Sequence, residues 1–178
     1  MSNPYALADV PTFHLTSQTV TDGQPLPLAQ WSGMLGVPGG QDVSPHLAWS
    51  EFPPGTKSFV VTMYDPQAPT GSGFWHWAIA DNPATTTELA ENAGAAGPEQ
   101  LPGEAFHLGG DAGAQQYVGA AAPAGTGRTH SYYTTVSALD IDKTGLDETA
   151  SAAYLGFAIS RHTLARAGLR CPTPAPAA

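Results

Sequence analysis

The residues best suited to chemistry lie in one short stretch, Tyr64–Trp77, which reads Y-D-P-Q-A-P-T-G-S-G-F-W-H-W. It places a carboxylate, Asp65, at the end of an apolar run, and a histidine, His76, in an aromatic segment that follows a turn rich in proline and glycine. A second histidine, His130, lies two residues before Tyr132 in a later segment. Imidazole and phenol groups can hydrogen-bond a ligand. The sequence therefore predicts a pocket for a small anionic or polar ligand between these side chains.

Each of these residues also has a purely structural interpretation. An aspartate before proline is common in turns, and a lone histidine on an apolar face is usually a hydrogen-bonded core residue. The functional interpretation depends on the combination. Two strands would each present a histidine and an aromatic residue on one face, close to a carboxylate at a strand end.

The sequence does not support other kinds of site. The histidines show neither H-x-H nor H-E-x-x-H spacing, and Cys171 has no partner cysteine, so we expect neither a zinc site nor a disulfide. Ser72 lacks the glycine two residues earlier that a nucleophile elbow needs. No glycine-rich loop matches a dinucleotide or nucleoside-triphosphate motif. We therefore expect no metal and no cofactor, and we interpret Cys171 as a spectator in a loose tail.

The composition predicts a globular protein with an acidic surface. The 178 residues include 15 Asp or Glu but only 6 Lys or Arg, which gives a formal net charge of −9. This charge disfavours nucleic acid and anionic membranes as partners. The N-terminus has no secretory signal pattern, and the apolar runs are too short to span a bilayer. We therefore expect a cytoplasmic protein without membrane insertion.

Short strand-like segments dominate the chain. The strongest is Lys57–Tyr64, which is apolar on both faces and is expected to be a central strand. Alternation along Phe74–Ala80 predicts one face with Phe74, His76 and Ala78 and an opposite face with Trp75, Trp77 and Ile79. The other predicted strands are Phe13–Val20, His46–Trp49, Ala105–Leu108, Gln116–Val118 and His130–Leu139.

Helix signals are few. Thr86–Asn92 could form one or two turns, and the long candidate is Ser151–Ala167, with Asp147, Thr149 or Ser151 as its cap. The segment 169–178 is predicted to lack fixed structure, because Pro172, Pro174 and Pro176 disfavour a normal strand. The sequence thus predicts one mainly β domain over residues 1–168, a sandwich or Greek-key arrangement, followed by a tail.

Four segments occur in an order that resembles a known family. They are Asp42–Ser50, Tyr64–Trp77, Y-V-G-A-A-A-P-A-G (Tyr117–Gly125) and H-S-Y (His130–Tyr132). Over roughly residues 10–167 the chain resembles the bacterial branch of the phosphatidylethanolamine-binding proteins, also called Raf-kinase-inhibitor-like proteins. The resemblance implies an antiparallel β-sandwich with a few peripheral helices. It also implies a small surface pocket that holds phosphate, acetate, cacodylate or a phosphoethanolamine headgroup.

Carried over by motif, the resemblance implies a ligand-binding pocket formed by Asp65, Pro69, Phe74, His76, Ala122, Pro123, His130 and Tyr132, with Gln67 beside them. The family usually has a second acid at Gln67 and an arginine at Ser131. Loss of that acid removes repulsion of an anionic ligand, and serine cannot replace the paired contact of arginine with a carboxylate. The family also usually continues into a further β segment, which Gly168–Ala178 is expected not to supply.

Three functions are compatible with these residues. The first is a binding module with a regulatory role. The second is an enzyme on a repurposed scaffold, in which Asp65, His76 and His130 perform general acid–base chemistry in a dehydration, isomerisation or cyclisation. The third, suggested by the family name, is an inhibitor that contacts a kinase or protease. A homodimer is a further possibility, since bacterial relatives often pair.

Overall fold

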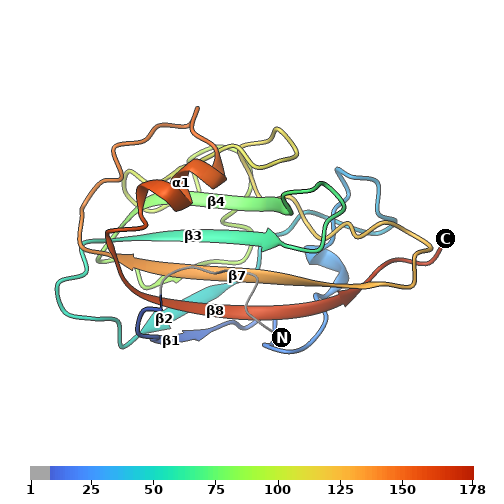
Figure 1. Ribbon diagram of the computed structural model, residues 1–178, viewed down its shortest axis with the longest axis horizontal. Helices are drawn as coiled ribbons and strands as arrows, with labels where there is room; N and C mark the ends of the chain where they lie inside the picture. Colours follow the sequence, from blue (N-terminus) through green and yellow to red (C-terminus); the bar gives the residue numbers. More distant parts are fainter. Residues whose placement is uncertain (1–8) are drawn as a thin grey trace.

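The computed structural model describes residues 9–178 and is built mainly from antiparallel strands (Figure 1). A large sheet has five strands in the order β6-β4-β3-β7-β8, and a small sheet has three in the order β1-β2-β5. The strands of the large sheet are β3 (Ser58–Asp65), β4 (Phe74–Pro83), β6 (Phe106–His107), β7 (Thr129–Leu139) and β8 (Thr163–Pro174). Those of the small sheet are β1 (His14–Thr16), β2 (Leu47–Ser50) and β5 (Glu88–Leu89). The mainly β prediction is confirmed.

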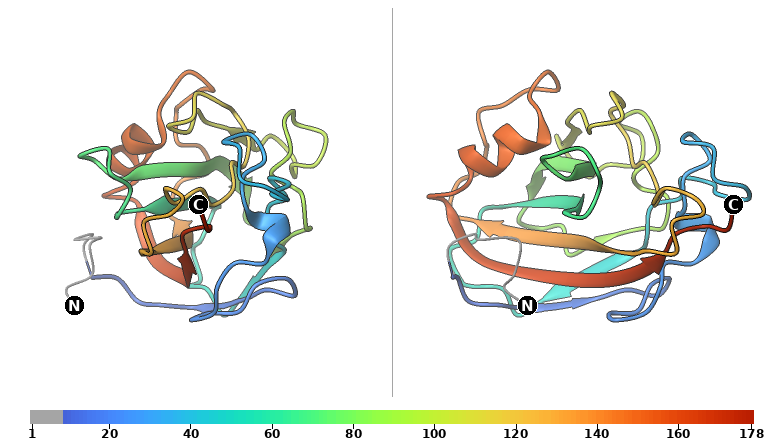
Figure 2. Two further views of the ribbon diagram at one scale, coloured as in Figure 1. Left: turned by 90° about the vertical axis from the view of Figure 1, so that its right-hand side faces the viewer. Right: turned by 45° about the vertical axis from the view of Figure 1, so that its right-hand side comes forward.

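Helical structure in the described residues is limited to a 3-10 turn, Leu28–Gln30, and the helix α1 (Ala152–Ala158). Neither is long and apolar enough to cross a membrane. In Figure 2 the small sheet and α1 lie on opposite sides of the large sheet.

The main core fills the space between the two sheets. Inward-facing residues of β3, such as Phe59 and Met63, pack with Trp77 of β4 and with Trp49 of β2. The ring centroids of Trp49 and Phe59 are 5.3 Å apart. A second apolar cluster joins the outer face of the large sheet to α1, with Leu155 among its buried members. As predicted, β3 lies in the middle of the sheet, and its first four residues, Ser58 to Val61, are buried on both faces, which explains the apolar run among them.

The predicted helix Ser151–Ala167 is correct only in its first half. Ser151 is the cap, and its hydroxyl accepts a hydrogen bond from the backbone N–H of Tyr154. The helix ends at Ala158, and the chain then enters β8. From Ala165 to Thr173 every odd-numbered residue is buried and the residues between them are more exposed. This two-residue period is that of a strand, and pairing with β7 outweighs the helical preference of the alanines.

The prediction of an unstructured tail at 169–178 is wrong for its first part, because β8 runs to Pro174 and pairs with β7. Pro172 and Pro174 fit because β8 is an edge strand. The N–H group of Arg170 points away from β7 and donates to Asp22. Pro172 and Pro174 lie two and four residues further along the strand, so their nitrogen atoms point in the same direction. A proline nitrogen at these positions therefore removes no donor from the β7 ladder. Cys171 is no spectator, since it is 1% exposed in the main core, and burial raises its pKa to about 11.

Two smaller predictions also fail. Thr86–Asn92 is not helical, because Glu88–Leu89 pairs with β2 as β5 and Asn92 has a φ of +67° in a turn. Gln116–Val118 is not a strand, although Tyr117 and Val118 are buried and their N–H groups donate to Gly94 and His76. In both segments, residues from distant parts of the chain provide hydrogen-bond partners for the backbone N–H and C=O groups.

Candidate functional site

The candidate site lies where three strands of the large sheet meet at one edge, on the right in Figure 1. There β3 ends at Asp65, β4 begins just before His76, and β7 begins just before His130. A cavity of about 180 Å³ opens between these strand ends and two loops. Its lining consists of Leu35, Asp65, Ala68, Pro69, Thr70, Phe74, His76, Ala121, Ala122, Pro123 and His130. The structure thus brings together most of the residues that the sequence singled out.

A β-bulge directs His76 into this cavity. Met63 pairs with Trp77 and Tyr64 pairs with Trp75, so His76 is an extra residue without a partner on β3. The predicted alternation along β4 is therefore wrong: Trp75 packs against the cluster beneath α1, whereas Trp77 lies in the main core. The predicted neighbours Phe74 and His76 are nevertheless adjacent, with ring centroids 4.8 Å apart. Bulges commonly re-aim side chains beside functional sites.

Asp65 and His130 form a buried pair. The Nδ1 atom of His130 is 2.7 Å from Oδ2 of Asp65, and the two residues are 3% and 2% exposed. The other oxygen, Oδ1, accepts a hydrogen bond from the backbone N–H of Gln67 at 2.8 Å. Because a carboxylate only accepts, the bonded Nδ1 carries the proton, and Nε2 is the nitrogen left for a ligand. The carboxylate also compensates a positive charge on the ring when the ring is protonated.

His76 is held in a different way. Its Nδ1 donates to the backbone carbonyl of Val118 at 2.9 Å. Burial lowers the pKa of His76, and this effect outweighs the opposing effects of the Val118 carbonyl and the Asp65 carboxylate. His76 is therefore neutral near pH 7, with Nε2 as an acceptor. The site combines one neutral imidazole with one imidazole paired to an acid.

The lowered pKa of His76 predicts how stability changes with pH. Burial also lowers the pKa of His107, so the unfolded chain binds more protons than the folded chain below the unfolded histidine pKa of about 6.5. The free energy of unfolding should therefore fall as the pH decreases from 7 to 5, by at most about 1.4 kcal/mol per pH unit for each histidine. Urea unfolding at several pH values measures this slope.

Two variants separate the contribution of His76 from other effects. His76→Gln should reduce the slope between pH 5 and 7, whatever it does to the absolute stability. His14→Gln, which changes an exposed histidine of β1, should leave the slope unchanged. An identical slope in His76→Gln and the unaltered protein would contradict the assignment.

Gln67 does not line the cavity but bonds to the backbone of β7. Its Oε1 accepts from the N–H of Ser131 at 2.6 Å, and its Nε2 donates to the carbonyl of Thr129 at 3.4 Å. The pairing of β3 with β7 ends at Tyr64 and Tyr133, and Ser131 and Thr129 lie on β7 just beyond that point. The Gln67 side-chain amide therefore takes the place of a β3 backbone group in bonding to β7. A carboxylate could accept from Ser131 but could not donate to Thr129. Gln67 therefore makes two backbone contacts, one of which a carboxylate could not make.

Tyr132 also lies behind the cavity wall. Its ring meets His76 edge-on, with centroids 5.2 Å apart at 72°. Burial, and then the Asp65 carboxylate, raise the pKa of its phenol, and the nearby backbone N–H groups of Ala121 and Ala122 only partly oppose this. Tyr132 therefore stays neutral and supports the His76 ring.

Four lining residues were not predicted: Leu35, Ala68, Thr70 and Ala121. Leu35 comes from the turn after the 3-10 segment and is 46% exposed. Asp42 positions this turn, because its Oδ2 accepts from the N–H of Met34 and its Oδ1 accepts from the N–H of Gly119, both at 2.8 Å. The available sequence signal was an apolar Met-Leu pair between Gly33 and Gly36.

A larger hollow adjoins the cavity. It has a volume of about 460 Å³, shares Pro69, Pro123 and His130 with the cavity, and adds Gln67, Thr126 and Arg128. The end of the chain borders this side, because the carbonyl of Pro176 accepts from the N–H of Gly125. No group of three or more potential metal ligands occurs within residues 9–178.

Comparison with known proteins identifies the family. Residues 16–172 match the phosphatidylethanolamine-binding protein family. The UPF0098 protein YbhB of Escherichia coli is 45% identical over 155 residues, which cover 87% of this chain and 96% of YbhB. The crystal structure of E. coli YbcL, described as a new member of the mammalian PEBP family, has a TM-score of 0.87 at 36% identity, covering 93% of this chain and 99% of that one. CT736 of Chlamydia trachomatis, a putative homologue in that description, has a TM-score of 0.73 at 26% identity, with 90% and 95% covered. This chain belongs to the phosphatidylethanolamine-binding protein family.

Proposed function

We propose that the protein is a binding module that takes a small phosphate-bearing ligand between His76 and His130. The observation that carries the proposal is that Nδ1 of each ring is bound within the protein, at 2.9 and 2.7 Å, while both rings line the same cavity. The Nε2 atoms are thereby the polar atoms that these rings offer to a ligand. A cytoplasmic location and a regulatory role, predicted from the sequence, belong to the same proposal.

The two rings favour a ligand that both donates and accepts. Neutral His76 accepts a hydrogen bond from a P–OH group, and protonated His130 donates to a phosphoryl oxygen. A phosphate monoester in its monoanionic form has both groups. The buried Asp65 carboxylate opposes further negative charge in the cavity, which favours a phosphate monoanion over a dianion. The remainder of an ester would extend into the adjoining hollow beside Arg128.

Titration calorimetry with inorganic phosphate and with phosphoethanolamine tests this proposal. His76→Gln and His130→Gln should each weaken phosphate binding about tenfold, and the double variant about a hundredfold, since a hydrogen bond to a charged group contributes about 1.5–3 kcal/mol. Binding should also weaken as the pH is raised from 6 to 8, because the phosphate group then loses the proton that His76 accepts and gains a second negative charge near Asp65. His14→Gln is the matched control, because His14 is exposed on β1. Equal affinity in the double variant and the unaltered protein would reject the proposal.

The second candidate is an enzyme. The specific observation is the buried Asp65–His130 pair at 2.7 Å, since an acid that orients an imidazole is the arrangement used for general acid–base catalysis. In this reading His130 moves a proton at Nε2 and His76 accepts one. Incubation of cell extract with the protein and with Asp65→Asn, followed by mass spectrometry, tests it. Conversion of a metabolite by the unaltered protein alone would support catalysis, and identical extracts would argue against it.

A further inference from the structure

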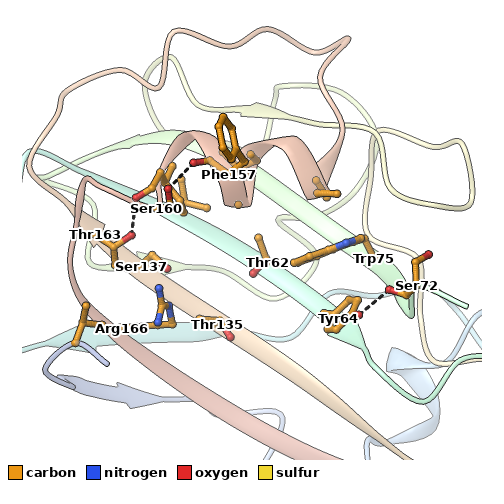
Figure 3. A pocket seen from close by; sticks show the side chains of 17 residues that line it. Thr62, Tyr64, Ser72, Trp75, Thr135, Ser137, Phe157, Ser160, Thr163 and Arg166 are labelled. Atoms are coloured by element: carbon orange, nitrogen blue, oxygen red, sulfur yellow. Dashed lines mark hydrogen bonds between the residues drawn. The ribbon is translucent and has the colours of Figure 1, made fainter. Parts of the chain in front are cut away.

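A second and larger cavity lies on the outer face of the large sheet, the side away from the main core. In Figure 3, α1 lies above β3 and β7, whose outer faces form the floor of a groove. The groove has a volume of about 540 Å³, against about 180 Å³ for the histidine cavity, and the two have no lining residue in common. Its size is within the range of about 300–1,000 Å³ that is typical of small-molecule sites.

The groove exists because α1 covers only part of the sheet. Beneath the helix, the outer face of the sheet carries apolar residues such as Val60 and Leu139. Away from the helix it carries hydroxyl side chains instead, on Thr62, Thr135 and Ser137 (Figure 3). The floor thus offers polar groups to a ligand at the foot of an apolar wall.

The walls are apolar and partly aromatic. On one side Leu155, Phe157 and Ile159 line the groove, and the Phe157 side chain is 73% exposed. At the far end Trp75 lines it, with its ring centroid 4.4 Å from that of Tyr64. An apolar wall from α1 together with an aromatic end wall favours an apolar ligand body.

The charge of the groove is opposite to that of the protein. Arg166 is the one charged residue among the described residues that line it, and no acid lines it, although the chain has 15 acids and a net charge of −9. Arg166 pairs in register with Ser137, so its backbone lies beside that hydroxyl. The carboxylates of Asp111 and Asp65 lie toward the other end of the groove, near Tyr64. The pKa of Tyr64 is raised mainly by burial and further by these two carboxylates. An anionic group therefore fits at the Arg166 end only.

We propose that this groove binds a small amphipathic carboxylate. The carboxylate pairs with the Arg166 guanidinium and accepts hydrogen bonds from Ser137 and Thr135. Its apolar body lies over the sheet between α1 and Trp75. Aliphatic and aromatic carboxylates share this chemistry, and the experiment below distinguishes them.

Gly156 provides a way to close the groove without disturbing its walls. It lines the groove from α1, and a Cβ added at this position would meet no atom within 4 Å. Its φ is not in the left-handed region, and leucine is a better helix former than glycine. Gly156→Leu should therefore fold normally and occupy the space proposed for the ligand body.

The test uses the fluorescent dye 8-anilinonaphthalene-1-sulfonate as the probe, displaced by dodecanoate in one arm and by 2-naphthoate in the other. We expect the unaltered protein to bind the dye and to release it to at least one carboxylate. Gly156→Leu should abolish this binding, and Arg166→Gln should weaken carboxylate binding at least about tenfold. Phe157→Ala should weaken it severalfold.

A matched control changes the same residue type outside the groove. Arg161→Gln removes an exposed charge from a residue that does not line the groove. This variant should bind like the unaltered protein. Displacement of the dye by inorganic phosphate, failure of both carboxylates to displace it, or unchanged binding in Gly156→Leu would overturn the proposal. So would a change from dimer to monomer in Phe157→Ala by analytical ultracentrifugation, since the groove would then be an interface between two copies.

Discussion

Deleting residues 169–178 is expected to leave the chain unfolded at 25 °C. The deletion removes the second half of β8, in which Leu169, Cys171 and Thr173 are 7%, 1% and 1% exposed. Losing the burial of a leucine costs about 1.5–3 kcal/mol, and each ladder hydrogen bond lost costs about 1 kcal/mol. The deletion also uncovers Tyr132 and leaves β7 as an open edge. The total of more than about 5 kcal/mol is comparable to the stability of a whole domain.

Far-ultraviolet circular dichroism and thermal unfolding measure this outcome. Deletion of Ala177 and Ala178 alone is the control, because both follow Pro176, whose carbonyl holds Gly125. That control should unfold within about 2 °C of the unaltered protein, since surface changes usually alter stability by less than 0.5 kcal/mol. A cooperative unfolding transition near the normal temperature in the 169–178 deletion would show that β8 is dispensable.

Asp65→Ala is expected to destabilise the fold by about 2 to 5 kcal/mol, because each buried donor left without an acceptor costs about 1–3 kcal/mol. The carboxylate accepts from Nδ1 of His130 at 2.7 Å and from the N–H of Gln67 at 2.8 Å. Alanine leaves both donors without an acceptor in a site where Asp65 and His130 are almost fully buried. Urea unfolding measures the difference in free energy.

Asp65→Asn is the matched variant. Its amide oxygen can still accept from Gln67, so it should cost less than half as much as alanine. It cannot compensate a charge on His130, so phosphate affinity should still fall about tenfold. If both variants were as stable as the unaltered protein, the hydrogen bonds of the Asp65 carboxylate would not be formed, or would not be buried, in solution.

Much of the fold follows from local sequence. The apolar run Lys57–Tyr64 predicts a central strand because only a strand covered on both faces buries such a run. The motif Y-D-P-Q-A-P-T-G-S-G-F-W-H-W likewise places Asp65 at a strand end and His76 on the next strand. Ser151 predicts the start of α1 because its hydroxyl can cap a free N–H group.

Other features depend on contacts between distant segments. Alanine-rich residues after Ala158 favour a helix locally, but pairing with β7 places them in β8. Pro172 and Pro174 argue against a strand unless the strand is known to lie at an edge. The β-bulge at His76 is visible only once β3 and β4 are in register.

The sequence by itself determined the class of fold, the family, and the acid and two histidines of the candidate site. The period of the apolar residues, the turn residues and the Tyr64–Trp77 motif are local properties of the chain. Tertiary structure alone decided which ring nitrogens stay available, since Asp65 and Val118 occupy the others from different segments. It alone created the groove under α1, because that hollow is the part of a sheet face that a short helix fails to cover. Side chains that are far apart in the chain become neighbours only when the strands pair, and no local pattern records that pairing.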